Sequence, residues 1–370
     1  AMEITPLSRQ SKPDALRDRL AHLALALGPD AKLPTIAQLC SDLGVSNNTL
    51  GRALKDLEGQ GIIERRNGVG LFAAKTVREN LARCVVLACN PGFFGAAHSP
   101  FWDLLVEEAR ARASQQNETF EMHFAHDFGP EPVAASVAQN IRDGKILGVL
   151  GVGVYDQAAA WFESQRVPFI SFAGSGTVQV LLDSAAFCDL AIEKLAAKGC
   201  RKIALWLTVP SHCPINDWDT EQHEIEWLAP FRAALQKRDL PFHADLVGSE
   251  AHRLRVGELF PFSAHQQGFE IARQVFSRPR AQWPDGIVIS EDMLAVGALT
   301  ALRHSEIEPG RDVEVVSHAN AGSNVLFAFE NAIETVQFHP RDIALQMFSL
   351  LDRALGGERF QNIQFRVQPR

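Results

Sequence analysis

The chain has 370 residues, long enough for two or three domains with a sizeable buried core. Hydrophobic residues make up 46% and charged residues 22%, and no apolar run approaches the ~20 residues of a membrane helix, so neither disorder nor a membrane span is expected. The formal net charge is −8, but residues 1–75 hold ten Lys/Arg against eight Asp/Glu, so they carry +2 and the remainder −10. A mildly basic head on an acidic body can still bind a polyanion locally.

The first 60 residues have the periodicity of three helices. Leucines recur along one face of residues 12–27, which predicts a first helix. Two shorter amphipathic helices follow, separated by Gly44. Their apolar faces are Ile36, Leu39 and Leu43, then Leu50, Ala53, Leu54 and Leu57.

The start of the third helix is polar. Ser46 is a good N-cap, and Asn47, Asn48 and Thr49 then fall in the exposed first turn. In a helix-turn-helix this end of the second helix of the motif enters the major groove, where Asn can pair with adenine and Thr can touch bases or phosphates. Arg52 and Lys55, one turn further on, are expected to hold phosphates of double-stranded DNA.

A hairpin is predicted after Gly61. The sequence IIERR, then NGVG, then LF indicates two short strands around an Asn-Gly turn. Arg65 and Arg66 precede this turn, which suits a phosphate or minor-groove contact by a wing. The alternative is a three-helix interaction module with a solvated basic hairpin.

Residues 33–72 resemble the winged helix-turn-helix of the GntR family of bacterial transcription regulators. The matching residues are Leu33-Pro34-Thr35, Leu39 to Ser46, Thr49, Arg52-Ala53-Leu54, Leu57, Gly61, Ile63 to Arg66, Gly68, Gly70 and Phe72. The resemblance departs at Ala37, Asn47 and Gly51, where family members often carry Arg, so a different operator is expected. The DNA-binding candidates are Thr35, Ser46, Asn47, Asn48, Thr49, Arg52, Lys55, Arg65, Arg66 and Gly68.

After a polar linker at residues 76–82, short apolar runs alternate with amphipathic helices. This alternation predicts an α/β domain over 83–370 with parallel sheets covered on both faces. Strands are expected at 84–89, 119–124, 146–151, 167–172, 202–207, 286–290 and 312–316. Helices are expected at about 101–116, 131–143, 156–165, 185–198, 226–238, 265–277, 292–304 and 340–355.

Parallel sheets bind ligands at the carboxyl ends of their strands. Phe101 and Trp102 follow the first expected strand, and Glu291 and Asp292 follow the sixth. Aromatic rings beside carboxylates suit a small polar ligand with one apolar face. Phe101 and Trp102 are equally compatible with the core, and Asp292 with a plain helix N-cap.

Residues 83 to about 357 resemble the effector-binding domain of the LacI/GalR regulators, which has the two-lobed fold of periplasmic sugar-binding proteins. The resembling segments are 99–102, 144–150, 167–170, 195–204, 231–235, 291–299 and 335–336. The resemblance implies one lobe over about 83–174 and 336–357 and another over about 178–333. It also implies a homodimer.

The family's ligand contacts carry over unevenly. Asp292 matches a sugar-hydroxyl acceptor and Phe101-Trp102 an aromatic wall, whereas Trp227 stands where an effector-binding Arg is frequent. Exchanging a cation for an indole favours a neutral ligand, such as a sugar. The effector-binding candidates are Phe101, Trp102, Asp183, Trp227, Glu291, Asp292 and Asn320.

The sequence therefore predicts a cytoplasmic transcription regulator, a repressor that binds a near-palindromic operator as a dimer and responds to a small neutral ligand. The alternative is an α/β enzyme or metabolite-binding protein whose head is only an interaction module. No G-x-G-x-x-G, G-x-S-x-G or P-loop motif favours an enzyme, and Gly174-Ser175-Gly176 lacks the flanking pattern of a nucleophile turn.

No cofactor or metal site is expected. His212, Cys213 and His223 have no zinc-binding spacing, and the six cysteines form no C-x-x-C pair. We therefore interpret the cysteines as buried free thiols.

Overall fold

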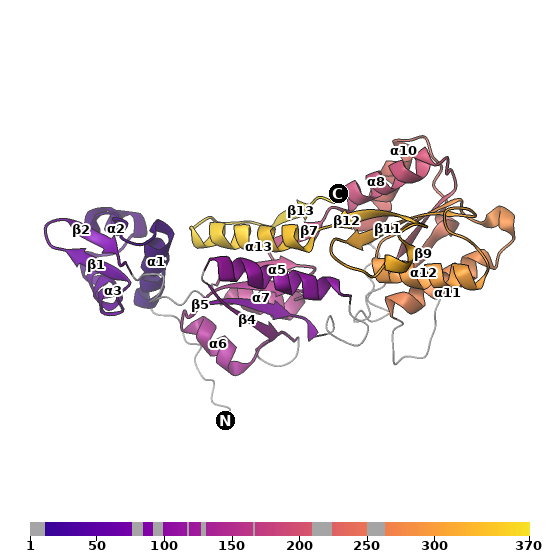
Figure 1. Ribbon diagram of the computed structural model, residues 1–370. Coiled ribbons are helices and arrows are strands. Elements are labelled where there is room, and N and C mark those ends of the chain that lie inside the picture. The colour runs from indigo at the N-terminus through magenta and orange to yellow at the C-terminus, as the bar shows by residue number, and fades with distance from the viewer. Residues whose placement is uncertain are drawn as a thin grey trace, which may run out of the picture. The chain divides into compact units, whose positions relative to one another are not determined.

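The computed structural model describes eight stretches of the chain (Figure 1), namely residues 12–75, 84–91, 99–116, 118–126, 131–165, 167–208, 224–249 and 263–370. By internal contacts the chain divides into two compact units. The first comprises Ala1–Cys89, Ala113–Val178 and Met347–Ile363; the second comprises Asn90–Arg112, Gln179–Gln346 and Gln364–Arg370. Both units are thus assembled from separate segments of the sequence.

The N-terminal head contains the three predicted helices and the predicted hairpin. Its elements are α1 (Lys12–Leu27), α2 (Ile36–Leu43), α3 (Asn47–Gly59), β1 (Ile63–Arg66) and β2 (Gly70–Ala73). The two strands pair antiparallel. Leu20, Leu50 and Leu54 are at most 1% exposed and form the centre of the core. Leu27 and Ile36, at the ends of their helices, are 42% and 37% exposed and add little to it.

A six-stranded sheet has the order β13-β7-β6-β5-β3-β4. Pairing is parallel between β3 and β4, β3 and β5, and β5 and β6, as predicted. The strands are β3 (Cys84–Cys89), β4 (Thr119–Phe124), β5 (Ile146–Val152), β6 (Phe169–Phe172), β7 (Val178–Leu182) and β13 (Ile363–Val367). Helices α6 (Ala135–Arg142) and α7 (Asp156–Ser164) belong to the first unit, and α5 (Phe101–Gln115) and α13 (Pro340–Leu355) have residues in both units.

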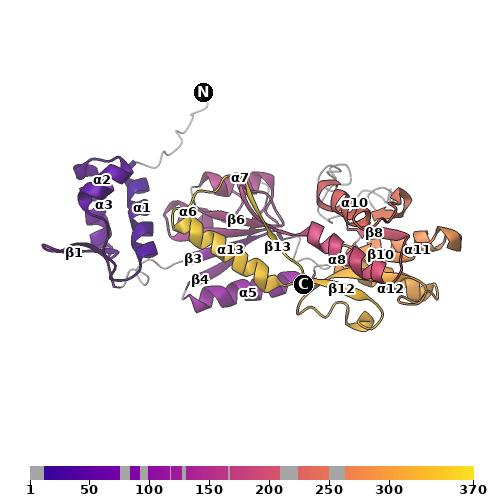
Figure 2. The same cartoon turned by 90° about the horizontal axis from the view of Figure 1, so that it is seen from above.

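Helix α13 packs closely on β5, and Gly148 makes this possible. A Cβ at Gly148 would lie 2.2 Å from Cδ1 of Leu351. A larger residue would therefore push the helix away from the strand. Figure 2 shows α13 running along this sheet.

A five-stranded parallel sheet has the order β12-β11-β10-β8-β9. Its strands are β8 (Ile203–Leu207), β9 (Val247–Ser249), β10 (Gly286–Ile289), β11 (Glu314–Asn320) and β12 (Glu334–Phe338). The helices are α8 (Ser184–Ala197), α10 (Ala229–Gln236), α11 (Ala264–Phe276) and α12 (Asp292–His304). A π-helix (Glu224–Leu228) precedes α10, and 3₁₀ turns lie at Ala244–Leu246, Arg280–Gln282 and Phe327–Phe329.

Helices α11 and α12 touch backbone to backbone. A Cβ at Gly268 would lie 1.9 Å from the carbonyl oxygen of Leu294, and a Cβ at Gly297 would lie 1.8 Å from that of His265. Only glycine allows this approach at either position. The contact holds α12, whose first residue is Asp292, firmly against its neighbour.

Within the described ranges, no helix has both the length and the apolar character needed to cross a membrane.

Candidate nucleic-acid interface and ligand site

The turn between α2 and α3 is built by side-chain caps. Thr35 caps α2, since its hydroxyl accepts from the Gln38 N–H at 3.3 Å while Gln38 Oε1 accepts from the Thr35 N–H at 2.9 Å. Gly44 ends α2 at φ 62°. Ser46 then caps α3 by accepting from the Thr49 N–H at 3.3 Å. Two of the predicted DNA-binding residues, Thr35 and Ser46, are thus used to fix the helix directions.

The outer face of α3 carries polar side chains. Asn47, Asn48, Arg52 and Lys55 are exposed, while the leucines of α3 are buried on the opposite face. Neither Arg52 nor Lys55 has a carboxylate partner among the described residues. These side chains form the surface that the sequence predicts for DNA contact, and we call them the α3 face.

The two wing arginines are engaged inside the head. Arg65 Nε lies 2.9 Å from Glu58 Oε1. Arg66 pairs with Asp30 and, at 3.1 Å, with Glu64, and its guanidinium lies 4.2 Å from the centroid of the Phe72 ring. These contacts neutralise both cations, so a phosphate contact by either would have to replace an ion pair.

The ion pairs shift the ionisation of their partners. The hydrogen bond from Arg66 lowers the pKa of Asp30 below its ordinary value. Hydrogen bonds to Asp30 and then Glu64 raise the pKa of Arg66. These residues line an open hollow of about 620 Å³ at the base of the wing. Gly68 occupies the tip of the hairpin at φ 74°, a conformation that glycine adopts without strain.

A second cluster lies at the carboxyl ends of β10 and β11. Asp292 is 1% exposed and Asn320 5% exposed. The Asn320 amide donates to Asp292 Oδ2 at 3.0 Å. The other carboxylate oxygen, Oδ1, is buried with no hydrogen-bond partner among the described residues. A buried acceptor of this kind is costly unless a ligand or water satisfies it.

Glu291, rather than Asp292, caps α12. Its carboxylate accepts from the Leu294 N–H at 2.7 Å. Burial, and after it the neighbouring Asp292 carboxylate, raises the pKa of Glu291 well above its ordinary value. Asp292 is therefore free of the capping role that was its alternative explanation.

His318 joins this cluster and was not predicted from the sequence. It is 6% exposed, and neither ring nitrogen has a hydrogen-bond partner among the described residues. Its ring centroid lies 5.4 Å from that of Phe338 and 6.2 Å from that of Phe187. Burial lowers the pKa of His318, which keeps the imidazole neutral. A single His inside an apolar strand has no local pattern that could have revealed it.

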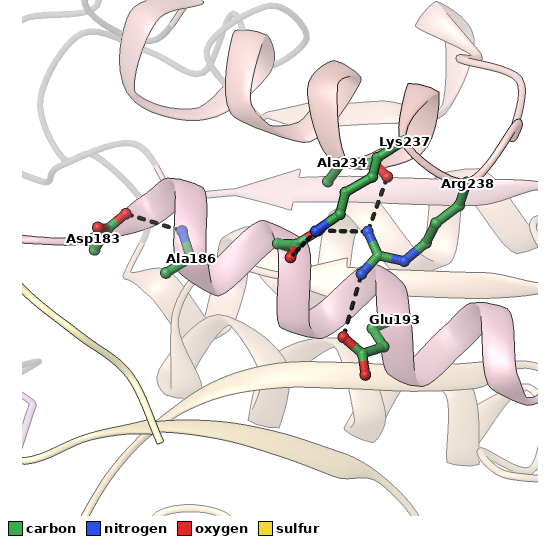
Figure 3. Close-up of polar contacts among 7 residues, drawn as sticks. Asp183, Ala186, Glu193, Ala234, Lys237 and Arg238 are labelled. Atoms are coloured by element: carbon green, nitrogen blue, oxygen red, sulfur yellow. Dashed lines mark hydrogen bonds and ion pairs between the residues drawn. The ribbon is translucent and has the colours of Figure 1, made fainter.

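Trp227 packs against Phe187, one of the aromatic rings around His318. Its ring centroid lies 5.8 Å from that of Phe187, edge to face. It belongs to the π-helix before α10, and α10 is clamped to α8 (Figure 3). Lys237 lies 2.8 Å and Arg238 2.5 Å from the Asp189 carboxylate, and Arg238 also lies 3.3 Å from Glu193.

Asp183 is a structural residue. One carboxylate oxygen accepts from the Ala186 N–H at 2.9 Å and caps α8, as Figure 3 shows. The other accepts from the Gln368 amide at 2.7 Å. Both carboxylate oxygens of Asp183 are thus engaged within the protein.

The predicted aromatic pair begins α5. Phe101 is 6% exposed and Trp102 is half-buried, with their ring centroids 4.8 Å apart. Leu104, one turn further along α5, lies 3.8 Å from where a Cβ on Gly322 would be. Gly322 is two residues beyond Asn320, so the start of α5 approaches the loop after β11.

No metal site is found among the described residues, since no three His, Cys, Asp or Glu side chains are grouped there. His212, Cys213 and His223 lie outside them. Burial raises the pKa of Cys84 to about 11 and those of Cys89, Cys188 and Cys200 to about 12. Cys40, expected to be buried, is only half-buried.

Two family models match the chain. Residues 14–72 match bacterial regulatory proteins of the gntR family, and residues 192–370 match a periplasmic binding protein-like domain. A 50-residue stretch is 42% identical to the HTH-type transcriptional regulator Rv1152 of Mycobacterium tuberculosis. Another 192 residues are 26% identical to the HTH-type transcriptional regulator GalR of Lacticaseibacillus casei. These matches cover 14% and 50% of this chain and 41% and 52% of those relatives.

Solved structures establish the fold. A regulatory protein of the LacI family from Chloroflexus aggregans has a TM-score of 0.59 at 17% identity, over 77% of this chain and 95% of that chain. The transcriptional regulator CelR in complex with cellobiose has a TM-score of 0.57 at 18% identity, over 91% and 98%.

Proposed function

We propose that this chain, which joins a GntR-type helix-turn-helix domain to a periplasmic-binding-protein-like domain, is a ligand-controlled transcription regulator. One observation carries the proposal: the chain contains two groups of polar side chains that are each suited to a different binding partner. The α3 face exposes amides and cations suited to DNA. At the carboxyl ends of the parallel strands, Asp292 buries a carboxylate oxygen that has no hydrogen-bond partner among the described residues. Together they suit a protein that binds two different partners.

The DNA-binding part of the proposal rests on the α3 face. Capping by Ser46 fixes where α3 begins, so Asn47 and Asn48 project from its first turn. In helix-turn-helix proteins this turn approaches base edges in the major groove. Arg52 and Lys55 continue along the exposed side of α3, where phosphates would neutralise them.

The proposed ligand is small, uncharged and rich in hydroxyl groups. Asp292 Oδ1 offers an acceptor, and the neutral imidazole of His318 offers one donor and one acceptor. The Trp227 and Phe187 rings give the group an apolar wall, which suits the C–H face of a sugar. The cellobiose in the CelR structure supports this ligand class for a protein of this fold.

The proposed assembly is a homodimer on a near-palindromic operator, because a two-fold dimer presents two α3 faces to two half-sites. Edge strand β4 carries two exposed apolar side chains on one face, Met122 (42%) and Phe124 (51%), which offer an apolar surface for such a contact. We propose that the protein is a repressor, and that ligand favours the state that binds DNA less well. The ligand can shift the balance between the two states only by the difference in its binding free energy to them, typically about 1–3 kcal/mol.

The test begins with selection of bound duplexes from a random pool at low salt, followed by anisotropy titration of the selected duplex with and without sugars, cellobiose included. We expect a two-fold symmetric site, and release of DNA by at least one sugar. Asp292→Asn should bind DNA as the wild type does but ignore the sugar. Asp245→Asn, an exposed change in the same unit, is the matched control and should respond normally. Failure to enrich any duplex would contradict the proposed function.

A further inference from the structure

We infer that Asn48 is the residue through which α3 selects its base, and that the selected base is an adenine in each half-site. This inference rests on the proposed function and specifies its DNA target. Asn48 is the second residue of α3, is exposed, and makes no side-chain hydrogen bond among the described residues. Both its carbonyl oxygen and its amide group are therefore available to a base edge.

Asn47, its neighbour, is placed differently. The Cys40 thiol of α2 donates to Asn47 Oδ1 at 3.1 Å. This bond ties the Asn47 side chain back to α2 and occupies part of its carbonyl oxygen. Asn47 is thus held toward α2 by a weak thiol hydrogen bond, whereas neither polar group of the Asn48 side chain is engaged among the described residues, so Asn48 can form two hydrogen bonds at once without losing a contact.

The chemistry of Asn48 selects adenine over guanine. In the major groove adenine presents an acceptor, N7, beside a donor, the N6 amino group. An amide matches both, donating to N7 and accepting from N6. Guanine presents two acceptors, N7 and O6, so the amide oxygen would face O6 without a proton between them.

Proteins usually recognise guanine with an arginine that donates two hydrogen bonds. Both arginines of the wing are instead held in ion pairs within the head. Arg65 is paired with Glu58, and Arg66 with Asp30 and Glu64. The only free arginine of the α3 face is Arg52, which is one turn further from the helix start than Asn48. A cation there is better placed for the phosphate flank than for the groove floor.

The experiment uses the full chain and the duplex selected from the random pool. Each adenine common to both half-sites is replaced by 7-deazaadenine, which removes the N7 acceptor while preserving base pairing. For the wild type we expect the replacement at one position to weaken binding roughly 5- to 150-fold, the range for a bidentate base contact. Asn48→Ala removes both hydrogen bonds, so it should lose at least the same factor on the unmodified duplex and be insensitive to the replacement. Asn67→Ala, an exposed Asn at the wing tip, is the control and should retain the sensitivity.

Each outcome discriminates. Enrichment of a symmetric site in which no adenine is sensitive to 7-deaza replacement would overturn the inference while leaving the proposed function intact. So would full sensitivity retained by Asn48→Ala. The replacement in the wild type needs no variant, so a misfolded mutant cannot obscure the result. Absence of any enriched duplex would instead refute the proposed function itself.

Discussion

The guanidinium of Arg66 pairs with the carboxylate of Asp30, which precedes it by 36 residues. This pair joins the turn after α1 to the base of the wing. The same guanidinium lies over Phe72 on the partner strand of the hairpin. Arg66 therefore acts as a brace for the wing.

Because Arg66 is bound within the head and Lys55 is exposed on the α3 face, we expect their substitutions to have different effects on stability and on DNA binding. Arg66→Ala should lower the melting temperature of the protein by loosening the wing, without changing the slope of DNA affinity against salt. Lys55→Ala, on the α3 face, should leave stability unchanged and reduce that slope by about one unit. Calorimetry and anisotropy titrations over several salt concentrations measure both. If Arg66→Ala reduces the slope of DNA affinity against salt, then Arg66 contacts a phosphate and the wing is part of the DNA interface.

The Asp30 pair should also respond to acid. Because the folded state lowers the pKa of Asp30, the pair contributes stability above the unfolded pKa of about 3.9 and loses it as pH falls through the lower folded pKa. We expect Asp30→Asn to be less stable than the wild type at pH 6, and the difference to shrink as pH falls below about 3.9. A difference that does not change between pH 6 and the acidic end of the range would contradict the ion pair.

Glu291 predicts the opposite dependence on pH. Burial raises its pKa, so between about pH 4.3 and the folded pKa the folded state binds one more proton than the unfolded state. Stability should fall with rising pH in this window, by at most about 1.4 kcal/mol per unit. Glu291→Gln keeps an oxygen to cap α12 and should remove the decline, so it should be more stable than the wild type at pH 7 and similar at pH 4. Urea unfolding across this pH range measures it.

His318 should couple the ligand site to stability. Burial lowers its pKa, so stability should decline as pH falls below the unfolded value of about 6.5. His318→Met replaces two ring nitrogens, which have no hydrogen-bond partner among the described residues, with a flexible side chain that packs well against aromatic rings. We expect the variant to lose this acid sensitivity and to lose the sugar response while binding DNA normally. A normal sugar response would remove His318 from the ligand site.

Periodic sequence patterns predicted the helices well, because burial of one helix face repeats along the chain. The expected helices at 12–27 and 340–355 are observed with the same bounds. The expected helix at 226–238 is instead a π-helix followed by α10, since no pattern signals the extra residue per turn. The expected strand at 312–316 begins at Glu314 and continues to Asn320. Strands β7, β9, β12 and β13 were not predicted. Strand β9 has only three residues, and polar residues separate the apolar ones in β12 and β13, so none of these three forms a continuous apolar run.

The candidate sites were predictable only where their signal is local. Asn47 and Asn48 follow from the cap at Ser46, and Asp292 from its place after a strand. The pairing of Arg66 with Asp30 depends on two segments that only the folded head brings together. His318 is surrounded by rings from two other elements, which no sequence window contains.

Two glycines allow a matched test of how α12 is held. Gly297→Ala would place a Cβ 1.8 Å from the backbone oxygen of His265, so α12 must move away from α11. We expect a loss of about 1–3 kcal/mol in stability and a weaker sugar response, because Asp292 begins the displaced helix. Gly51→Ala, on the exposed side of α3 with no atom within 4 Å of the new Cβ, should instead stabilise the protein by up to about 1 kcal/mol. Equal effects of the two changes on stability would mean that α11 and α12 are not in backbone contact.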